Sequence, residues 1–101
     1  MIMTYNKKNL TVKKVTIIIN NETGFHARPS AVFAKTANNF NSEITVSKGT
    51  ESVNGKSILG LMTLAAVKGT KLSVKAIGVD AESAISAISA VAKNNFEEVE
   101  K

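Results

Sequence analysis

KLSVKAIGVDAESAISAISAVAK, residues 71–93, decides the fold of this chain. Apolar and polar residues alternate over 71–77, which is typical of a strand with one buried face, here formed by Leu72, Val74 and Ala76. Asp80 is a good N-cap for the helix that follows. In that helix the apolar residues recur with the helical period, as Ala81, Ala84, Ile85, Ile88, Val91 and Ala92. The stretch therefore predicts a half-buried strand and then an amphipathic helix.

The preceding residues predict the same two kinds of element. Residues 12–19 are rich in β-branched side chains and predict a strand. Residues 27–38 follow a helical pattern, with Pro29 in the first turn and a stripe of small residues that would lie close to the sheet, namely Ala27, Ala31, Ala34 and Ala37.

The middle of the chain predicts a hairpin and a short helix. Residues 43–47 and 51–53 read as two strands joined by a turn at 48–50, and 57–64 as a helix. The resulting order is β-α-β-β-α-β-α. We therefore expect a two-layer, open-faced α/β sandwich of the α+β kind, with a mostly antiparallel four-stranded sheet and three helices on one face.

Length and composition limit the possible classes. The chain has 101 residues, which suits one small domain, and we assign 12–101 to it. Residues 1–11 are polar and aperiodic, and we expect a disordered or weakly ordered extension. They lack the apolar segment of a signal peptide, and no stretch is long enough for membrane insertion, so a cytoplasmic protein is the default expectation.

Charge and side-chain chemistry exclude further classes. The chain has no cysteine and one histidine, which excludes thiolate chemistry and a site with several histidine ligands, and we expect no metal and no cofactor. The net charge of +5 would suit nucleic acid, but the lysines are scattered and aromatic residues are few. We therefore expect no nucleic-acid partner, although a basic binding module remains an alternative.

The chain's only histidine, arginine and proline lie within four residues, as His26, Arg28 and Pro29, with Gly24 just before them. His26 directly precedes a predicted helix, whose first N–H groups lack helical partners and whose dipole favours anions. The guanidinium of Arg28 can bind a phosphoryl group in a bidentate manner. A neutral imidazole can attack phosphorus, so the cluster favours a phosphoryl acceptor over a surface histidine.

The segment Gly24-Phe25-His26-Ala27-Arg28-Pro29-Ser30-Ala31 resembles the active-site segment of the histidine-containing phosphocarrier family, HPr, of the bacterial phosphoenolpyruvate-dependent sugar phosphotransferase system. A second segment, residues 54–64, also matches that family at the family's spacing. The resemblance covers roughly residues 12–96 and implies the same sandwich. It further implies that His26 accepts a phosphoryl group from enzyme I at the ring nitrogen nearer the backbone. His26 would then pass the group to enzyme IIA domains, with Arg28 neutralising its charge and Pro29 shaping the helix start. Such a protein is a carrier in a chain of transfers, not a turnover enzyme.

Ser57 opens the predicted short helix, where a plain N-cap is the ordinary interpretation. The resemblance implies a second role, because in related proteins the matching serine is phosphorylated by an HPr serine kinase/phosphatase. That modification slows phosphorylation of the histidine and permits binding to a catabolite-control transcription factor. A protein that acts only through phosphorylated Ser57 remains an alternative, although the presence of His26 counts against it.

The short helix is apolar almost all round, so some of its side chains are expected to remain exposed as a partner surface. By resemblance we assign that surface to Phe25, Ile58, Leu59 and Met62, and leave open whether Leu61 and Leu64 belong to the core. The chain departs from the family pattern at Phe25, where an aliphatic residue is usual, and at Ala65, where glycine is common. A monomer is expected.

Overall fold

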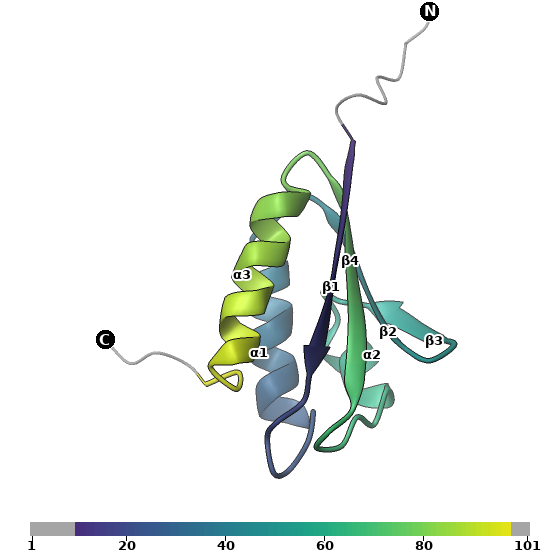
Figure 1. The fold of residues 1–101 in the computed structure, drawn as a ribbon, viewed down its shortest axis with the longest axis vertical. Helices are drawn as coiled ribbons and strands as arrows, with labels where there is room; N and C mark the ends of the chain where they lie inside the picture. Colours follow the sequence, from purple (N-terminus) through teal and green to yellow (C-terminus); the bar gives the residue numbers. More distant parts are fainter. Residues whose placement is uncertain (1–9, 98–101) are drawn as a thin grey trace, which may run out of the picture.

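The structure is a computed structural model that describes residues 10–97 (Figure 1). Its elements, in chain order, are β1 (Thr11–Ile18), α1 (Ala27–Ala37), β2 (Glu43–Lys48), β3 (Glu51–Asn54), α2 (Ile58–Thr63), β4 (Lys71–Gly78) and α3 (Ala81–Lys93). The predicted order β-α-β-β-α-β-α is confirmed.

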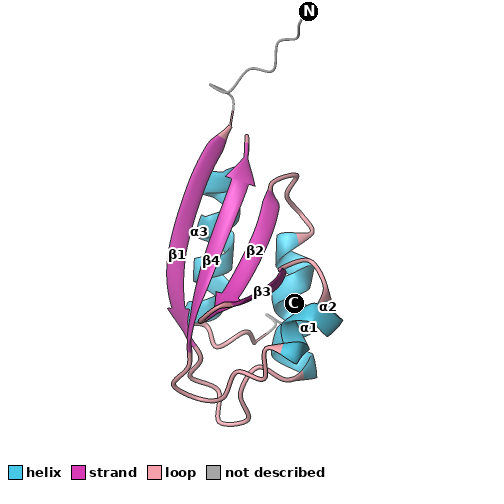
Figure 2. Cartoon of the chain, turned by 90° about the vertical axis from the view of Figure 1, so that its right-hand side faces the viewer, coloured by secondary structure: helices cyan, strands magenta, loops and turns pink. Residues whose placement is uncertain are grey.

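The four strands form one sheet in the order β1-β4-β2-β3, and all three pairings are antiparallel (Figure 2). Val74 at the centre of β4 pairs with Val15 on one side and with Val46 on the other, so the inward-facing residues of three strands lie in one row. The opposite face carries Lys14 and Lys75 in directly paired positions. This alternation places one face of the sheet on the core and the other in solvent, as predicted.

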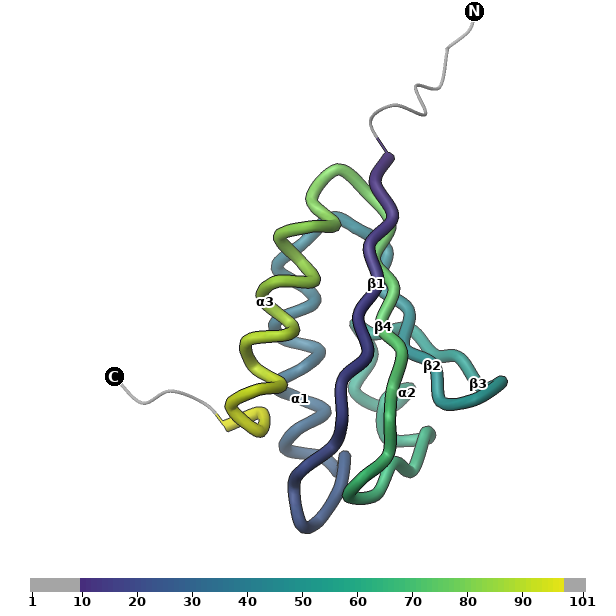
Figure 3. Tube along the Cα trace, in the orientation of Figure 1, coloured from purple at the N-terminus to yellow at the C-terminus, as the bar shows by residue number. Residues whose placement is uncertain are grey.

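Helices α1 and α3 lie side by side on the inner face of the sheet, as Figures 1 and 3 show. Helix α2 packs against α1 and β3, and its Leu61 and Leu64 are fully buried. The open question about these two leucines is thereby settled, because both belong to the hydrophobic core.

The face that α1 buries differs from the predicted alanine stripe. Ala34 and Ala37 are buried, but Ala27 is exposed and Ala31 is half-buried. Ser30 and Phe33 are both fully buried in their place. A serine is tolerated there because its hydroxyl donates a hydrogen bond to the carbonyl of Phe25 at 3.2 Å.

Asp80 occupies the N-cap position of α3, but its side chain makes no capping hydrogen bond, which corrects the sequence prediction. The carboxylate instead accepts hydrogen bonds from the hydroxyl and N–H of Ser42 and from the N–H of Asn41, the latter at 2.8 Å. The Ser42 hydroxyl and then the Asn41 N–H hold the pKa of Asp80 below its ordinary value. Asp80 therefore joins the start of α3 to the loop before β2.

The predicted extension over residues 1–11 is too long by at least one residue, because Thr11 already pairs with Gly78 in the sheet. Residues 1–9 lie outside the described part of the chain, as do residues 98–101, which include most of the acidic tail.

Ala65 follows the end of α2 with a φ of 50°, in the left-handed region. We expect Ala65→Gly to stabilise the fold by about 0.5–1 kcal/mol, because glycine avoids the left-handed penalty but loses more chain entropy on folding. Chemical denaturation measures the change. Ala90→Gly, in the exposed interior of α3, is the matched control and should cost about 1 kcal/mol. A loss of stability in Ala65→Gly would contradict the expectation.

Candidate functional site

His26 is the N-cap residue of α1, in an extended backbone conformation, and its side chain makes no capping hydrogen bond. Its carbonyl accepts the first helical bond, from the N–H of Ser30 at 3.0 Å. The N–H groups of Ala27 and Arg28 come too early in the helix to have helical acceptors, and Pro29 has no N–H. The exposed imidazole therefore stands beside unpaired donors and an exposed guanidinium.

The loop before His26 is held against the loop that precedes β4, and the two loops adjoin at the foot of Figure 3. Gly24 has a φ of 75°, and a Cβ atom there would meet the carbonyl oxygen of Ala66 at 2.5 Å. The next residue, Phe25, donates its N–H to that same oxygen at 2.8 Å. Glycine is therefore required at position 24 for the close approach that fixes the backbone ahead of His26.

One exposed ion pair also joins the two loops. The Nζ of Lys68 lies 2.6 Å from a carboxylate oxygen of Glu22. The hydrogen bond and charge of Lys68 lower the pKa of Glu22. Because both side chains are largely solvated, this pair contributes little to stability, and the backbone contacts are what hold the loops together.

Phe25, which we predicted to lie on the partner surface, is only 3% exposed, although it lines the smaller of the two clefts beside His26. Its ring packs against Phe33 of α1 and against Phe96, with centroid distances of 5.9 Å and 5.3 Å. Burying a phenyl ring is strongly favourable, so the loop turns this side chain inward and leaves His26 pointing outward. The buried ring of Phe25 therefore fixes the loop that carries His26 to the hydrophobic core.

Two open clefts adjoin His26. The larger, about 420 Å³, is lined by Arg28 and Pro29 and by residues from both ends of the fold, namely Asn21, Thr23, Asn95, Phe96 and Glu97. The smaller, about 290 Å³, is lined by Phe25, Met62, Ala65, Ala66 and Val67, and it shares Thr23 and His26 with the larger. The structure thus brings together His26, Arg28 and Pro29, the three residues predicted for phosphoryl transfer.

Three of the predicted partner-surface residues are exposed on α2: Ile58 by 42%, Leu59 by 76% and Met62 by 38%. Met62 lines the smaller cleft beside His26, so the apolar surface reaches the histidine. A helix of six residues that buries Leu61 fully has no room to bury its other apolar residues. The prediction of an exposed apolar patch on this helix is confirmed.

Ser57 is the N-cap of α2 and accepts a hydrogen bond from the N–H of Gly60 at 2.9 Å. The ordinary capping interpretation is therefore confirmed. Ser57 is half-buried, and it lines neither of the clefts beside His26. The structure thus separates the serine from the histidine but leaves both at helix starts.

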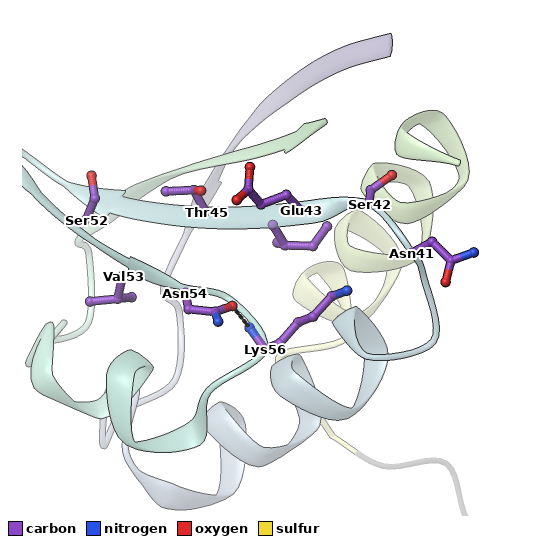
Figure 4. Close-up of a pocket in the computed structure, with 9 residues that line it drawn as sticks. Asn41, Ser42, Glu43, Thr45, Ser52, Val53, Asn54 and Lys56 are labelled. Atoms are coloured by element: carbon purple, nitrogen blue, oxygen red, sulfur yellow. Dashed lines mark hydrogen bonds between the residues drawn. The ribbon is translucent and has the colours of Figure 1, made fainter. Parts of the chain in front are cut away.

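A further cavity, of about 490 Å³, lies between β2, β3 and Lys56 and contains none of the predicted site residues (Figure 4). The Nζ of Lys56 donates to the carbonyl of Phe40 at 2.7 Å, and Asn54 Oδ1 accepts from the Lys56 N–H. The ammonium group of Lys56 is thus already engaged by a backbone carbonyl.

Sequence reasoning missed Asn21, Asn95 and Glu97 as residues of the larger cleft. Asn21 and Asn95 meet through a side-chain amide and a backbone carbonyl that lie 74 residues apart in sequence, and no local pattern signals this contact.

Within residues 10–97 there is no group of three or more histidine, cysteine, aspartate or glutamate side chains placed to hold a metal ion. The same residues contain no helix long and apolar enough to cross a membrane.

An open-faced sandwich that presents a single histidine and an arginine at the start of its first helix defines a class of small phosphoryl carriers. The family model for the PTS HPr component phosphorylation site matches residues 13–94. The phosphocarrier protein HPr of Neisseria meningitidis is 45% identical over 87 residues, which cover 86% of this chain and 98% of that protein.

Solved structures of HPr proteins have the same fold as this chain. An HPr from Thermoanaerobacter tengcongensis is 45% identical, with a TM-score of 0.80 over 86% of this chain and 99% of that one. Crh, the catabolite repression HPr of Bacillus subtilis, is 37% identical, with a TM-score of 0.59 over 86% of this chain and 100% of that one. The chain belongs to the HPr family of phosphocarrier proteins of the phosphotransferase system.

Proposed function

We propose that His26 accepts a phosphoryl group from phosphorylated enzyme I and passes it to enzyme IIA domains during sugar uptake. The observation that carries the proposal is the placement of an exposed His26 beside Arg28 and two unpaired N–H groups at the start of α1. Membership of the HPr family supports the same role. The domain that performs it begins at or before Thr11, the first residue of β1, and we expect it to act as a cytoplasmic monomer.

The transfer uses a ring nitrogen of His26 as the nucleophile. The lone pair of Nδ1 forms a bond to phosphorus while the bond between phosphorus and the donor breaks, and the other ring nitrogen keeps its proton. The guanidinium of Arg28 and the N–H groups of the first helical turn then face the negative oxygens. Transfer to the next protein reverses these steps, and the imidazole is regenerated.

The test is to mix the protein with enzyme I and phosphoenolpyruvate and to measure its intact mass. We expect one added phosphoryl group, which acid removes, because a phosphorus–nitrogen bond on imidazole is acid-labile. An enzyme IIA domain added afterwards should take up the group as the carrier loses it. The proposal would be contradicted if the protein gained no mass, or if the added group were stable in acid.

For the partner surface we propose Ile58, Leu59 and Met62, whose exposed side chains lie on one short helix, with Met62 lining the smaller cleft beside His26. Exposed apolar patches of this kind mark interaction sites, and a flexible methionine adapts to partners of different shape. Enzyme I and the enzyme IIA domains would both dock here, since each must reach the same histidine.

For Ser57 we propose regulation by an HPr serine kinase/phosphatase, with the phosphorylated form binding a catabolite-control transcription factor. A phosphate at the start of α2 would be compatible with the helix, so partners would sense it without unfolding. The similarity to a catabolite repression HPr supports this regulation. A protein acting only in this way is less well supported, since it would have no use for an exposed His26.

We expect the kinase to add one acid-stable phosphate to the protein and none to Ser57→Ala, measured by intact mass. The phosphorylated protein should then accept phosphoryl groups from enzyme I more slowly, because the added charge lies beside the shared apolar surface. Ser52→Ala, an exposed serine of β3, is the matched control and should behave like the unchanged protein. Equal rates before and after modification would rule out this regulation.

A further inference from the structure

The backbone is strained on both sides of His26. Within residues 10–97, three residues other than glycine have a positive φ: Ala65 at 50°, Asn95 at 56° and Phe96 at 59°. Ala65 lines the smaller cleft beside His26, and the other two line the larger one. Residues in such conformations persist only where their surroundings hold them, and they concentrate at functional sites.

The strained turn of residues 94–97 follows α3 and is held from two directions. The Phe96 N–H donates to the carbonyl of Val91 at 2.8 Å, and the Phe96 ring is buried against Phe25. From the opposite side, the Nδ2 of Asn21 donates to the carbonyl of Asn95 at 2.7 Å. Because Asn21 and Phe25 both belong to the loop that leads to His26, that loop and the turn are fixed to each other.

Only the nitrogen of the Asn21 side-chain amide makes a hydrogen bond within the described residues. Since the Asn95 carbonyl requires a donor, Nδ2 must face it, and this orientation places Oδ1 on the other side. Oδ1 is buried and has no hydrogen-bond partner among the described residues. A buried acceptor without a partner costs free energy, which offsets part of the gain from the Asn95 contact. The contact therefore matters more for the position of the turn than for overall stability.

We propose that Asn21 is a positioning residue for the phosphoryl site: it fixes residues 94–97 as a wall on one side of the open His26 cleft, and this wall limits the access of water to phosphorylated His26 from that side. The inference rests on the proposed function. In hydrolysis, a water oxygen bonds to phosphorus and the phosphorus–nitrogen bond breaks. The electron pair stays on the imidazole nitrogen, and inorganic phosphate leaves. A carrier must keep this hydrolysis slow while it moves between partners. A wall beside the phosphoryl group slows hydrolysis because it keeps water molecules from reaching the phosphorus atom from that side.

The experiment compares the lifetime of the phosphorylated protein with and without the Asn21 contact. The wild-type protein and Asn21→Ala are phosphorylated, enzyme I is removed, and the loss of the phosphoryl group is followed by intact mass at neutral pH. Losing one hydrogen bond should raise the population of the displaced turn about fivefold, so the half-life should fall by about two- to fivefold. Asn20→Ala is the matched control, because Asn20 is exposed and lies outside this cleft, and its half-life should be unchanged.

A second measurement tests directly whether residues 94–97 are held less firmly in the variant. Hydrogen exchange of the Phe96 amide, which is bonded to Val91, should become faster in Asn21→Ala while amides in the centre of β4 stay protected. Should Asn21→Ala not fold, Asn21→Asp serves instead, because it keeps the size of the side chain and removes the donor. A half-life equal to that of the wild type would overturn the inference, as would an equal loss in Asn20→Ala.

The two proposals fail in different ways. If the wild-type protein takes up no phosphoryl group on His26, the proposed function is wrong. If it does so and Asn21→Ala has an unchanged half-life, only the role of Asn21 is wrong.

Discussion

His26→Ala is expected to abolish phosphoryl uptake from enzyme I completely. The chain contains no other histidine, so no second imidazole can take over the transfer. The loss should not reflect unfolding, because the side chain is exposed and makes no capping hydrogen bond. Stability should change by no more than about 0.5 kcal/mol, as for ordinary surface substitutions. Intact mass measures uptake, and chemical denaturation measures stability.

Arg28→Lys is a useful companion to this variant. It keeps the positive charge beside His26 but removes the planar fork that can bind two phosphoryl oxygens at once. Uptake should persist at a reduced rate, which separates the nucleophile from the group that assists it. Acid-labile phosphate appearing on His26→Ala would place the acceptor elsewhere in the chain and end the present assignment.

Gly24→Ala is expected to lower the stability of the fold and to slow phosphoryl transfer, and its effect should be second only to that of His26→Ala. The new Cβ would meet the Ala66 carbonyl oxygen at 2.5 Å, and φ at this position is 75°. The left-handed backbone alone costs about 1–2 kcal/mol for a residue with a side chain. Relief of the clash must also move the two loops apart, which weakens the hydrogen bond from Phe25 to Ala66 and displaces His26. We therefore expect a loss of at least about 2 kcal/mol and slower phosphoryl uptake.

Gly49→Ala provides the matched control for this substitution. Gly49 also has a positive φ, of 61°, but a Cβ there would meet no atom within 4 Å. Gly49→Ala should therefore cost only the conformational penalty and leave uptake unchanged. If the two variants lose the same stability and transfer equally well, the contact with Ala66 does not hold the site.

Local patterns were sufficient to predict most of the fold. The alternation of Leu72, Val74 and Ala76 identified the central strand, and the helical spacing of Ala84 and Ile88 identified α3. The hairpin was predicted from the turn residues around Gly49, which lies between β2 and β3. In each case the periodicity of the backbone determines which side chains face the core, so the information is contained within a few residues.

Contacts between distant residues could not be predicted in this way. The motif around His26 identified the nucleophile, but the inward direction of Phe25 depends on Phe96, which lies 71 residues later. Asp80 had a local role as a cap, yet Ser42 and Asn41 compete for its carboxylate from another loop. The tie between Asn21 and Asn95 is of the same kind. These features depend on the packing of the whole chain.

The two ends of the described chain lie differently with respect to the site, and this bears on how the protein should be handled. In Figure 1 the described chain begins at the top of β1, whereas the loop that carries His26 lies at the opposite end of the molecule. Glu97, the last described residue, lines the larger cleft beside His26. An affinity tag or fluorescent fusion placed directly after Glu97 would therefore adjoin the larger cleft beside His26, whereas one placed directly before β1 would be attached at the opposite end of the fold. Assays of phosphoryl transfer should accordingly use protein purified through its N-terminus.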